Sequence, residues 1–245
     1  MPRMFCLLVL VFISTRSAAA PKPIVTFIAG EWPAYTNSDG TGTYWQIIKH
    51  IYQDEFELSL TTSSWRRANN LVKAGKVDAL VGIFTEEKGK LIIPRHHIDT
   101  EYAILALFDS KRHQIRGAED LARLTIAGRS NYGFEHFIPK SINYYGVDSI
   151  IDTNKLVLNQ RVDAVLVSAY NHKKADPSGS LDFVTVIPAQ KLFIGFKNNK
   201  QGKKLRQIFD QKMAEMLKAD EVRQYFPSLE AFEHVTWFNG FDYPR

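Results

Sequence analysis

Apolar runs and helical stripes alternate along most of the chain. The run at 24–29 is continuous and rich in β-branched residues, which is typical of a buried parallel strand. The segment 44–52 carries apolar residues at helical spacing, and 56–60 alternates apolar and polar residues as a half-buried strand does. This order of strand, helix and strand predicts an α/β fold.

A helix followed by an apolar strand then occurs twice. In the first copy a helical stripe begins at Trp65, Gly75 is placed as its C-terminal cap, and a strand covers 76–82. In the second copy a helical stretch at 152–160 leads into a strand at 161–167. Both strands begin with a basic residue followed by Val-Asp-Ala. Because the helix-to-strand context repeats together with this tripeptide, the sequence predicts two similarly built lobes.

The rest of the pattern supplies more strands and one long helix. Further strands are predicted at 103–108, 124–127, 181–187 and 191–196. An amphipathic helix at 203–225 is stopped by Pro227. Its stripe of methionine and aromatic residues is typical of core packing rather than of a binding surface.

These elements predict where the chain crosses from one lobe to the other. We expect the polar connection at 109–117 to be the first crossing and the strand at 191–196 to be the return. The first lobe then comprises 20–109 and 193–245, and the second lobe comprises 110–192.

The N-terminus, 1–19, has the pattern of a cleavable export signal. A basic start is followed by an apolar run at 5–13 and by small residues up to Ala20. The run is too short for a membrane span, which needs about 20 apolar residues. The only cysteine, Cys6, lies inside the signal, so the chain is not lipidated and the mature protein has no cysteine. We therefore expect a bacterial protein that is exported to the periplasm and stabilised by its own core.

Charge excludes one class of partner. The formal net charge is +5 at pH 7, and removal of the signal takes away Arg3 and Arg16 but no acid, which lowers it to +3. The basic residues are scattered along the chain, so nucleic acid is not an expected partner. The mature chain of about 225 residues can bury a core of its own in one or two domains.

Several short motifs, taken in order, resemble a known family. They are Glu31-Trp32-Pro33-Ala34-Tyr35, Trp65-Arg66-Arg67-Ala68, the block 75–82 followed by Thr85-Glu86-Glu87-Lys88, and Arg161-Val162-Asp163-Ala164. Their order and spacing are similar to those of family 3 extracellular solute-binding proteins, the type II periplasmic binding proteins that serve ABC importers of polar amino acids. The resemblance covers nearly the whole mature chain.

The resemblance implies a fold and a function. Two Rossmann-like lobes joined by two crossing strands would close on a small polar solute, either an amino acid or an organic anion. The protein would be a monomer without catalysis or cofactor, and its partner would be an ABC permease or a membrane receptor.

Two positions depart from the pattern of the family. Its amino-acid binders usually grip the α-carboxylate with an arginine where this chain has Lys88, which lacks the planar fork of arginine. They usually hold the α-ammonium with an aspartate where this chain has Ser168, and a hydroxyl cannot balance a buried ammonium. An anionic or neutral polar solute therefore fits about as well as an α-amino acid.

The candidate binding residues lie at strand ends and at the start of one helix. They are Glu31, Trp32, Tyr35, Trp65, Arg67, Gly82, Thr85, Lys88, Arg129, Ser130, Asn131, Tyr132 and Ser168. The loop at 128–133 offers backbone N–H groups to an anion. Trp32 and Trp65 have an alternative role in packing their own lobe, and Arg67 has one in a surface ion pair.

Two other functions stay open at this point. One is a periplasmic enzyme on the same fold, similar to the cyclohexadienyl dehydratases, with Glu31 or Glu86 as acid or base. The other is a partner-binding sensor whose cleft is vestigial. The sequence has no nucleophile paired with a base, no metalloprotease motif and no phosphate loop, and the pair His96-His97 is expected to be solvated rather than to bind a metal.

Overall fold

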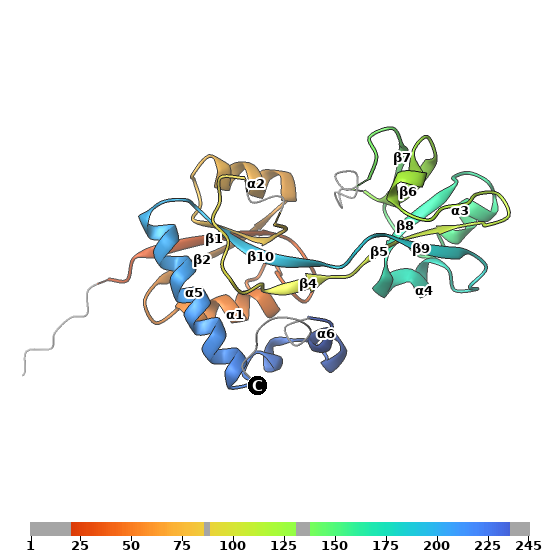
Figure 1. The fold of residues 1–245 in the computed structure, drawn as a ribbon. Coiled ribbons are helices and arrows are strands. Elements are labelled where there is room, and N and C mark those ends of the chain that lie inside the picture. The colour runs from red at the N-terminus through yellow and green to blue at the C-terminus, as the bar shows by residue number, and fades with distance from the viewer. Residues whose placement is uncertain (1–20, 86–88, 131–137, 236–245) are drawn as a thin grey trace, which may run out of the picture.

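Two separate sheets organise the molecule. The computed structural model describes residues 21–85, 89–130 and 138–235, so the predicted export signal lies outside the described residues. One five-stranded sheet has the order β2-β1-β3-β10-β4 and the other β7-β6-β8-β5-β9. Figure 1 shows the two sheets in two lobes that are joined by long strand segments. The predicted two-lobed α/β fold is confirmed.

The elements have the following bounds. The strands are β1 Ile24–Gly30, β2 Glu57–Ser63, β3 Ala79–Ile83, β4 Asp99–Glu101, β5 Ile104–Phe108, β6 Thr125–Arg129, β7 Asn143–Val147, β8 Ala164–Ser168, β9 Asp182–Ile187 and β10 Gln190–Phe196. The α-helices are α1 Thr43–Tyr52, α2 Trp65–Lys73, α3 Asn154–Leu158, α4 His172–Ala175, α5 Lys200–Lys218 and α6 Leu229–His234. Short 3-10 helices are η2 Ala118–Leu121, η4 Ala169–Asn171 and η5 Arg223–Tyr225. None of the helices in the described segments is long and apolar enough to cross a membrane.

The first lobe has three layers. Its strand β1 runs parallel to β2 and β3. Alternate β1 residues face opposite layers, because Phe27 belongs to the core shared with α1 and α5, whereas Ile28 packs with Ala68 and Val72 of α2. The long helix was predicted to continue to 225, but α5 ends at Lys218 because the chain turns at Asp220, where φ is 55°.

The repeated Val-Asp-Ala has the same structural role in both lobes. In the first copy Asp78 Oδ2 accepts a hydrogen bond of 3.0 Å from the backbone N–H of Thr26, and the Asp78 N–H donates to the Thr26 carbonyl. In the second copy Asp163 makes the same two bonds with Thr125, at 2.8 and 2.7 Å. Each aspartate therefore ties its strand to the first parallel strand of its own lobe, and the prediction of two similarly built lobes is confirmed.

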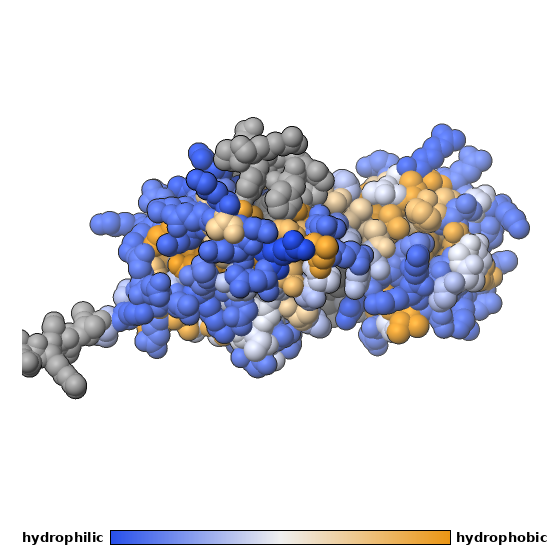
Figure 2. Space-filling model, turned by 90° about the horizontal axis from the view of Figure 1, so that it is seen from below, coloured by the Kyte–Doolittle hydropathy of each residue, from blue (hydrophilic) through white to orange (hydrophobic). Residues whose placement is uncertain are grey.

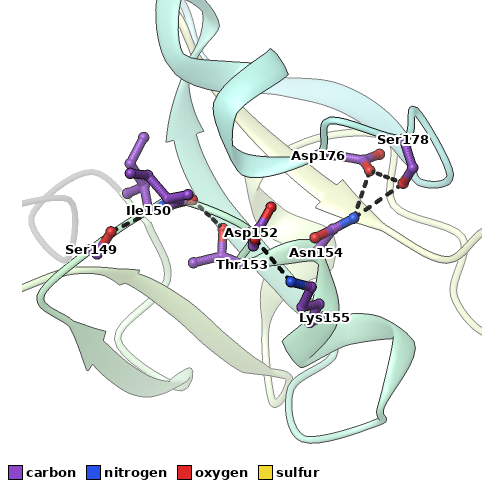
Figure 3. Close-up of polar contacts among 9 residues, drawn as sticks. Ser149, Ile150, Asp152, Thr153, Asn154, Lys155, Asp176 and Ser178 are labelled. Carbon is purple, nitrogen blue, oxygen red and sulfur yellow. Dashed lines mark hydrogen bonds and ion pairs between the residues drawn. The ribbon is translucent and has the colours of Figure 1, made fainter.

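A polar network holds α3 in the second lobe (Figure 3). The Asn154 amide donates to Asp176 Oδ1 at 2.8 Å, and so does the Ser178 hydroxyl. The Leu181 N–H donates to Asp176 Oδ2 at 2.9 Å. Burial would raise the pKa of Asp176, but these hydrogen bonds outweigh it and leave the pKa lowered. The network thus fastens α3 to the turn before β9.

The structure moves both crossings away from their predicted places. β4 pairs with β10 in the first sheet, whereas β5 pairs with β8 and β9 in the second. The chain therefore crosses at 102–103 and returns at 188–189, and the second lobe spans 104–187. The predictions of a crossing at 109–117, a return at 191–196 and a second lobe at 110–192 are wrong. The sequence of the apolar strand at 104–108 does not indicate which sheet it joins, because its partner strands lie far away in the sequence.

The two lobes differ in how well their apolar residues are covered. Within the described residues, five of the seven exposed large apolar side chains lie in the second lobe: Tyr145, Ile151, Leu158, Tyr170 and Phe183. Figure 2 shows the same contrast from below, with hydrophobic surface gathered on the second lobe and a largely polar first lobe.

The matching bonds of the two aspartates generate a prediction. Asp78→Ala leaves the Thr26 N–H without its acceptor and should lower the free energy of unfolding by about 1–3 kcal/mol. Asp78→Asn, which keeps a side-chain oxygen, should lose less, and Asp182→Ala at an exposed strand position should stay within about 0.5 kcal/mol of the parent. Urea unfolding measures all three. Equal effects of Asp78→Ala and Asp182→Ala would refute this role.

Candidate functional site

The ends of the parallel strands form an edge in each lobe. In open α/β sheets, ligands bind outside the carboxyl ends of such strands. In the first lobe β3 ends at Ile83, which pairs with Phe193, near the start of the strand that follows the return crossing. In the second lobe β8 ends at Ser168, which pairs with Ile104 directly after the first crossing. The two strand-end edges therefore lie on the sides of their lobes that face the crossings (Figure 1).

The Trp32 indole covers the first strand-end edge. A Cβ atom on Gly82 would lie 2.5 Å from a carbon of the Trp32 ring, and one on Gly30 would lie 3.3 Å from it. Gly82 also has φ of 87°, a conformation that L side chains rarely adopt. The candidate residue Gly82 is thus buried beneath Trp32, and its lack of a side chain makes room for the indole.

Hydrogen bonds fix the loop that carries Trp32. The Trp32 N–H donates to the Thr36 hydroxyl at 3.1 Å, and this hydroxyl donates to the Gly30 carbonyl at 2.7 Å. The Trp32 carbonyl accepts from the N–H groups of Tyr35 and Thr36 at 3.0 and 2.9 Å. Because Thr36 is fully buried, the loop is held from within and the backbone of Trp32 is fixed at the edge.

Four aromatic residues form a continuous group, which we call the aromatic wall: Trp32, Tyr35, Tyr44 and Trp65. The ring centroids of Trp32 and Trp65 are 5.8 Å apart, and those of Tyr35 and Tyr44 are 5.0 Å apart. Tyr44 joins the two pairs, because its ring also meets Trp32 edge-on at 6.3 Å. Trp32, Tyr35 and Trp65 are partly buried, whereas Tyr44 is 4% exposed. Such rings can stack on a planar group, an apolar group or a cation.

Two acids lie beside the aromatic wall, of which Asp99 is buried and Glu101 is partly buried. The Tyr44 hydroxyl donates to Asp99 Oδ2 at 2.7 Å, and Asp99 is 6% exposed. Burial raises the pKa of Asp99 to about 7, and burial also raises the pKa of Glu101 on the same strand. Burial, followed by the charge of Asp99, raises the pKa of Tyr35. Sequence reasoning missed both acids, although their place beside a predicted strand was a usable signal.

The second strand-end edge is polar. Ser168 is 7% exposed, and its hydroxyl accepts a hydrogen bond of 3.0 Å from the Asn171 amide. Arg129 ends β6 and is exposed. The Ser130 N–H donates to the Val147 carbonyl at 2.9 Å, so it is not available as part of the predicted anion cradle. Asn131 and Tyr132 lie outside the described residues.

The remaining candidates lie apart from the aromatic wall or cannot be placed. Glu31 and Thr85 are exposed at the first strand-end edge. Arg67 lines a shallow groove of about 450 Å³ along α2 together with Arg66, and no residue of the aromatic wall lines this groove. Lys88 lies outside the described residues.

The prediction that His96 and His97 are solvated is wrong for His97, whereas the His96 side chain is partly exposed. His97 is 2% exposed, and burial lowers its pKa to about 3. Nδ1 of His96 lies 3.5 Å from the Asp210 carboxylate on α5. Across the described residues, no group of three or more His, Cys, Asp or Glu side chains is arranged to hold a metal ion.

Several solved structures with a similar fold are those of substrate-binding proteins. No model of a known protein family matches the chain, and no curated protein matches its sequence. The probable amino-acid ABC transporter extracellular-binding protein ytmK from Bacillus subtilis has a TM-score of 0.59 and 17% identity, over 86% of this chain and 97% of that one. A mutant of ArgBP from T. maritima has a TM-score of 0.59 and 17% identity, over 84% and 96%. An ABC uptake transporter substrate binding protein from Streptococcus pneumoniae, with bound histidine, has a TM-score of 0.55 and 13% identity, over 84% and 93%. The chain therefore has the fold of these proteins.

The buried Asp99 and His97 predict opposite dependences of stability on pH. Asp99 binds its proton more tightly in the folded state, so it lowers stability as pH rises from about 4 to 7, by about 1.4 kcal/mol per pH unit. His97 binds its proton less tightly in the folded state, so it raises stability over pH 3 to 6.5 with a similar slope. The two slopes oppose each other between about pH 4 and 6.5.

Replacing one of these two residues should therefore reveal the dependence of stability on pH that the other one causes. Between about pH 4 and 6.5, Asp99→Asn should become more stable with rising pH relative to the parent, and His97→Gln should become less stable. Urea unfolding at three pH values in this range measures both. Identical slopes for the parent and both variants would show that neither group titrates as described.

Proposed function

We propose that the protein is a periplasmic solute-binding protein that holds a small polar solute between its lobes and delivers it to an ABC importer. The observation that carries this proposal is the placement of the aromatic wall on one strand-end edge while Ser168 and Ser130 lie on the edge of the other lobe. Solved structures with this fold include substrate-binding proteins of amino-acid ABC transporters.

The chemistry of the two edges favours one class of solute. An aromatic wall suits a planar, apolar or cationic group, and serine hydroxyls suit polar groups. The acids nearest the wall, Asp99 and Glu101, favour a solute with a positive group over an organic anion. We therefore propose an amino acid, with a cationic side chain as the first case. Proteins of this fold have been solved with arginine and with histidine bound.

The enzyme alternative names Glu31 or Glu86 as its acid or base. The enzyme alternative requires a carboxyl group sheltered from water beside a bound substrate. Glu31 is exposed and lacks that shelter, and Glu86 lies outside the described residues. Asp99 is sheltered, but its carboxylate is engaged by the Tyr44 hydroxyl at 2.7 Å, so we keep the proposal of binding without catalysis.

The predicted signal at 1–19 supports export, and a mature chain without cysteine suits an exported protein that is stabilised by its own core rather than by disulfides. We propose that it works as a monomer. A permease in the membrane would then receive the solute from it.

The test is a binding screen on the mature chain, 20–245. L-arginine, L-histidine, L-glutamine and succinate are added in a thermal unfolding assay, and the cationic amino acids should raise the melting temperature most. A solute present at a hundredfold its Kd adds about 2.7 kcal/mol to stability.

Variants then locate the solute. Trp32→Ala should weaken binding at least tenfold and Trp32→Phe should weaken it less, because phenylalanine keeps a stacking face. Phe183→Ala removes an exposed ring from β9 and is the matched control that should leave binding unchanged. Unchanged binding by Trp32→Ala, a stabilisation by succinate alone, or chemical conversion of a bound solute would each contradict the proposal.

A further inference from the structure

One hydrogen bond connects the aromatic wall to a crossing strand. Asp99 is the first residue of β4, and β4 leads directly into the crossing at 102–103. Its carboxylate accepts from the Tyr44 hydroxyl on α1 at 2.7 Å, and Tyr44 contacts both Tyr35 and Trp32. Tyr44 of the wall is thus linked to the crossing strand by a side-chain hydrogen bond between two almost fully buried groups.

We propose that Asp99 is a positioning residue for the binding site: by holding the Tyr44 hydroxyl, it sets where Trp32 and Tyr35 stand at the strand-end edge. The consequence for binding rests on the proposed function, whereas the position of the wall can be measured without any solute. Bending of the crossing strand and placement of the wall become coupled through this bond.

The strength of the hydrogen bond between Tyr44 and Asp99 depends on whether Asp99 is ionised. An ionised carboxylate accepts a charge-assisted hydrogen bond from a hydroxyl, which is shorter and stronger than the bond to a neutral acid. A pKa of about 7 for Asp99 places the change between the two forms near neutral pH. A neutral acceptor at this position would hold Tyr44 without that dependence.

Other titratable groups lie around this hydrogen bond, and a change in their charge would also act on the aromatic wall. Glu101 follows on the same strand, Tyr35 lies on the loop after β1, and Tyr102 lies in the crossing itself. From α6, the ring of His234 stacks on Tyr102 with centroids 3.5 Å apart, and Glu230 acts on Tyr102 through its charge. His97 lies just before β4, and the charge of Lys191 on β10 acts on it. Variants at Asp99 and Tyr44 separate the proposed bond from these groups.

The position of Trp32 can be followed by fluorine NMR. The mature chain is labelled with 5-fluorotryptophan, and the Trp32 signal is identified by its loss in Trp32→Phe. In the parent this signal should shift with pH, with a midpoint near 7. The shift should vanish in Asp99→Asn and in Tyr44→Phe. Tyr52→Phe is the matched control, because it removes another buried hydroxyl from α1, one that donates to the Leu205 carbonyl. In this control the shift should persist.

Binding of L-arginine supplies the second readout. The affinity of the parent should rise at least threefold between pH 6 and 8, and the rise should be clearly smaller in Tyr44→Phe, where only the attraction by the Asp99 charge remains. Because Tyr44→Phe keeps the Asp99 charge, full pH dependence in that variant would show attraction by charge alone and would overturn the positioning role. A Trp32 signal that does not respond to pH in the parent would overturn it as well. If the Trp32 signal behaves as expected but no amino acid binds at any pH, the positioning role stands and the proposed function is wrong.

Discussion

Two strand pairings carry the chain from one sheet to the other, and they decide where the candidate binding residues lie. β4 and β10 pair in the first sheet, while β5 and β9 pair in the second, so the crossings are confined to two short segments, 102–103 and 188–189. Each lobe then turns the carboxyl ends of its parallel strands towards these segments. The aromatic wall, the two acids beside it and Ser168 are gathered there because of this single topological constraint.

Local patterns predicted the elements well because their causes are local. Apolar periodicity located β1, α1 and β8, and Val-Asp-Ala indicated a structural repeat that the paired bonds of Asp78 and Asp163 explain. The crossing was misplaced because β5 obtains its sheet from partners distant in sequence. At the candidate site, the position of Trp32 after β1 could be predicted from the sequence, but its packing against Gly82 could not. Asp99 was missed because its hydrogen bond is made with a tyrosine of α1, which lies far away in the sequence.

The electrostatics of the site differ from those of the whole chain. The mature protein is mildly basic, yet Asp99 beside the aromatic wall is buried, and burial shifts its pKa into the neutral range. This local environment, rather than the net charge, bears on the solute. Under the proposed function, a positive group bound at the wall would be attracted by the charges of Asp99 and Glu101, which also act on Tyr35, in place of an acid at Ser168.

The central claim is that the two lobes hold a solute between their strand-end edges, and the distance between the lobes tests it most directly. The cysteine-free mature chain allows spin labels at Lys73→Cys on α2 and Asp148→Cys after β7, both of which are exposed. Saturating L-arginine should shorten the distance between the labels by several ångströms and narrow its distribution. An unchanged distance distribution, with binding of L-arginine shown by calorimetry on the same sample, would contradict closure of the lobes around the solute.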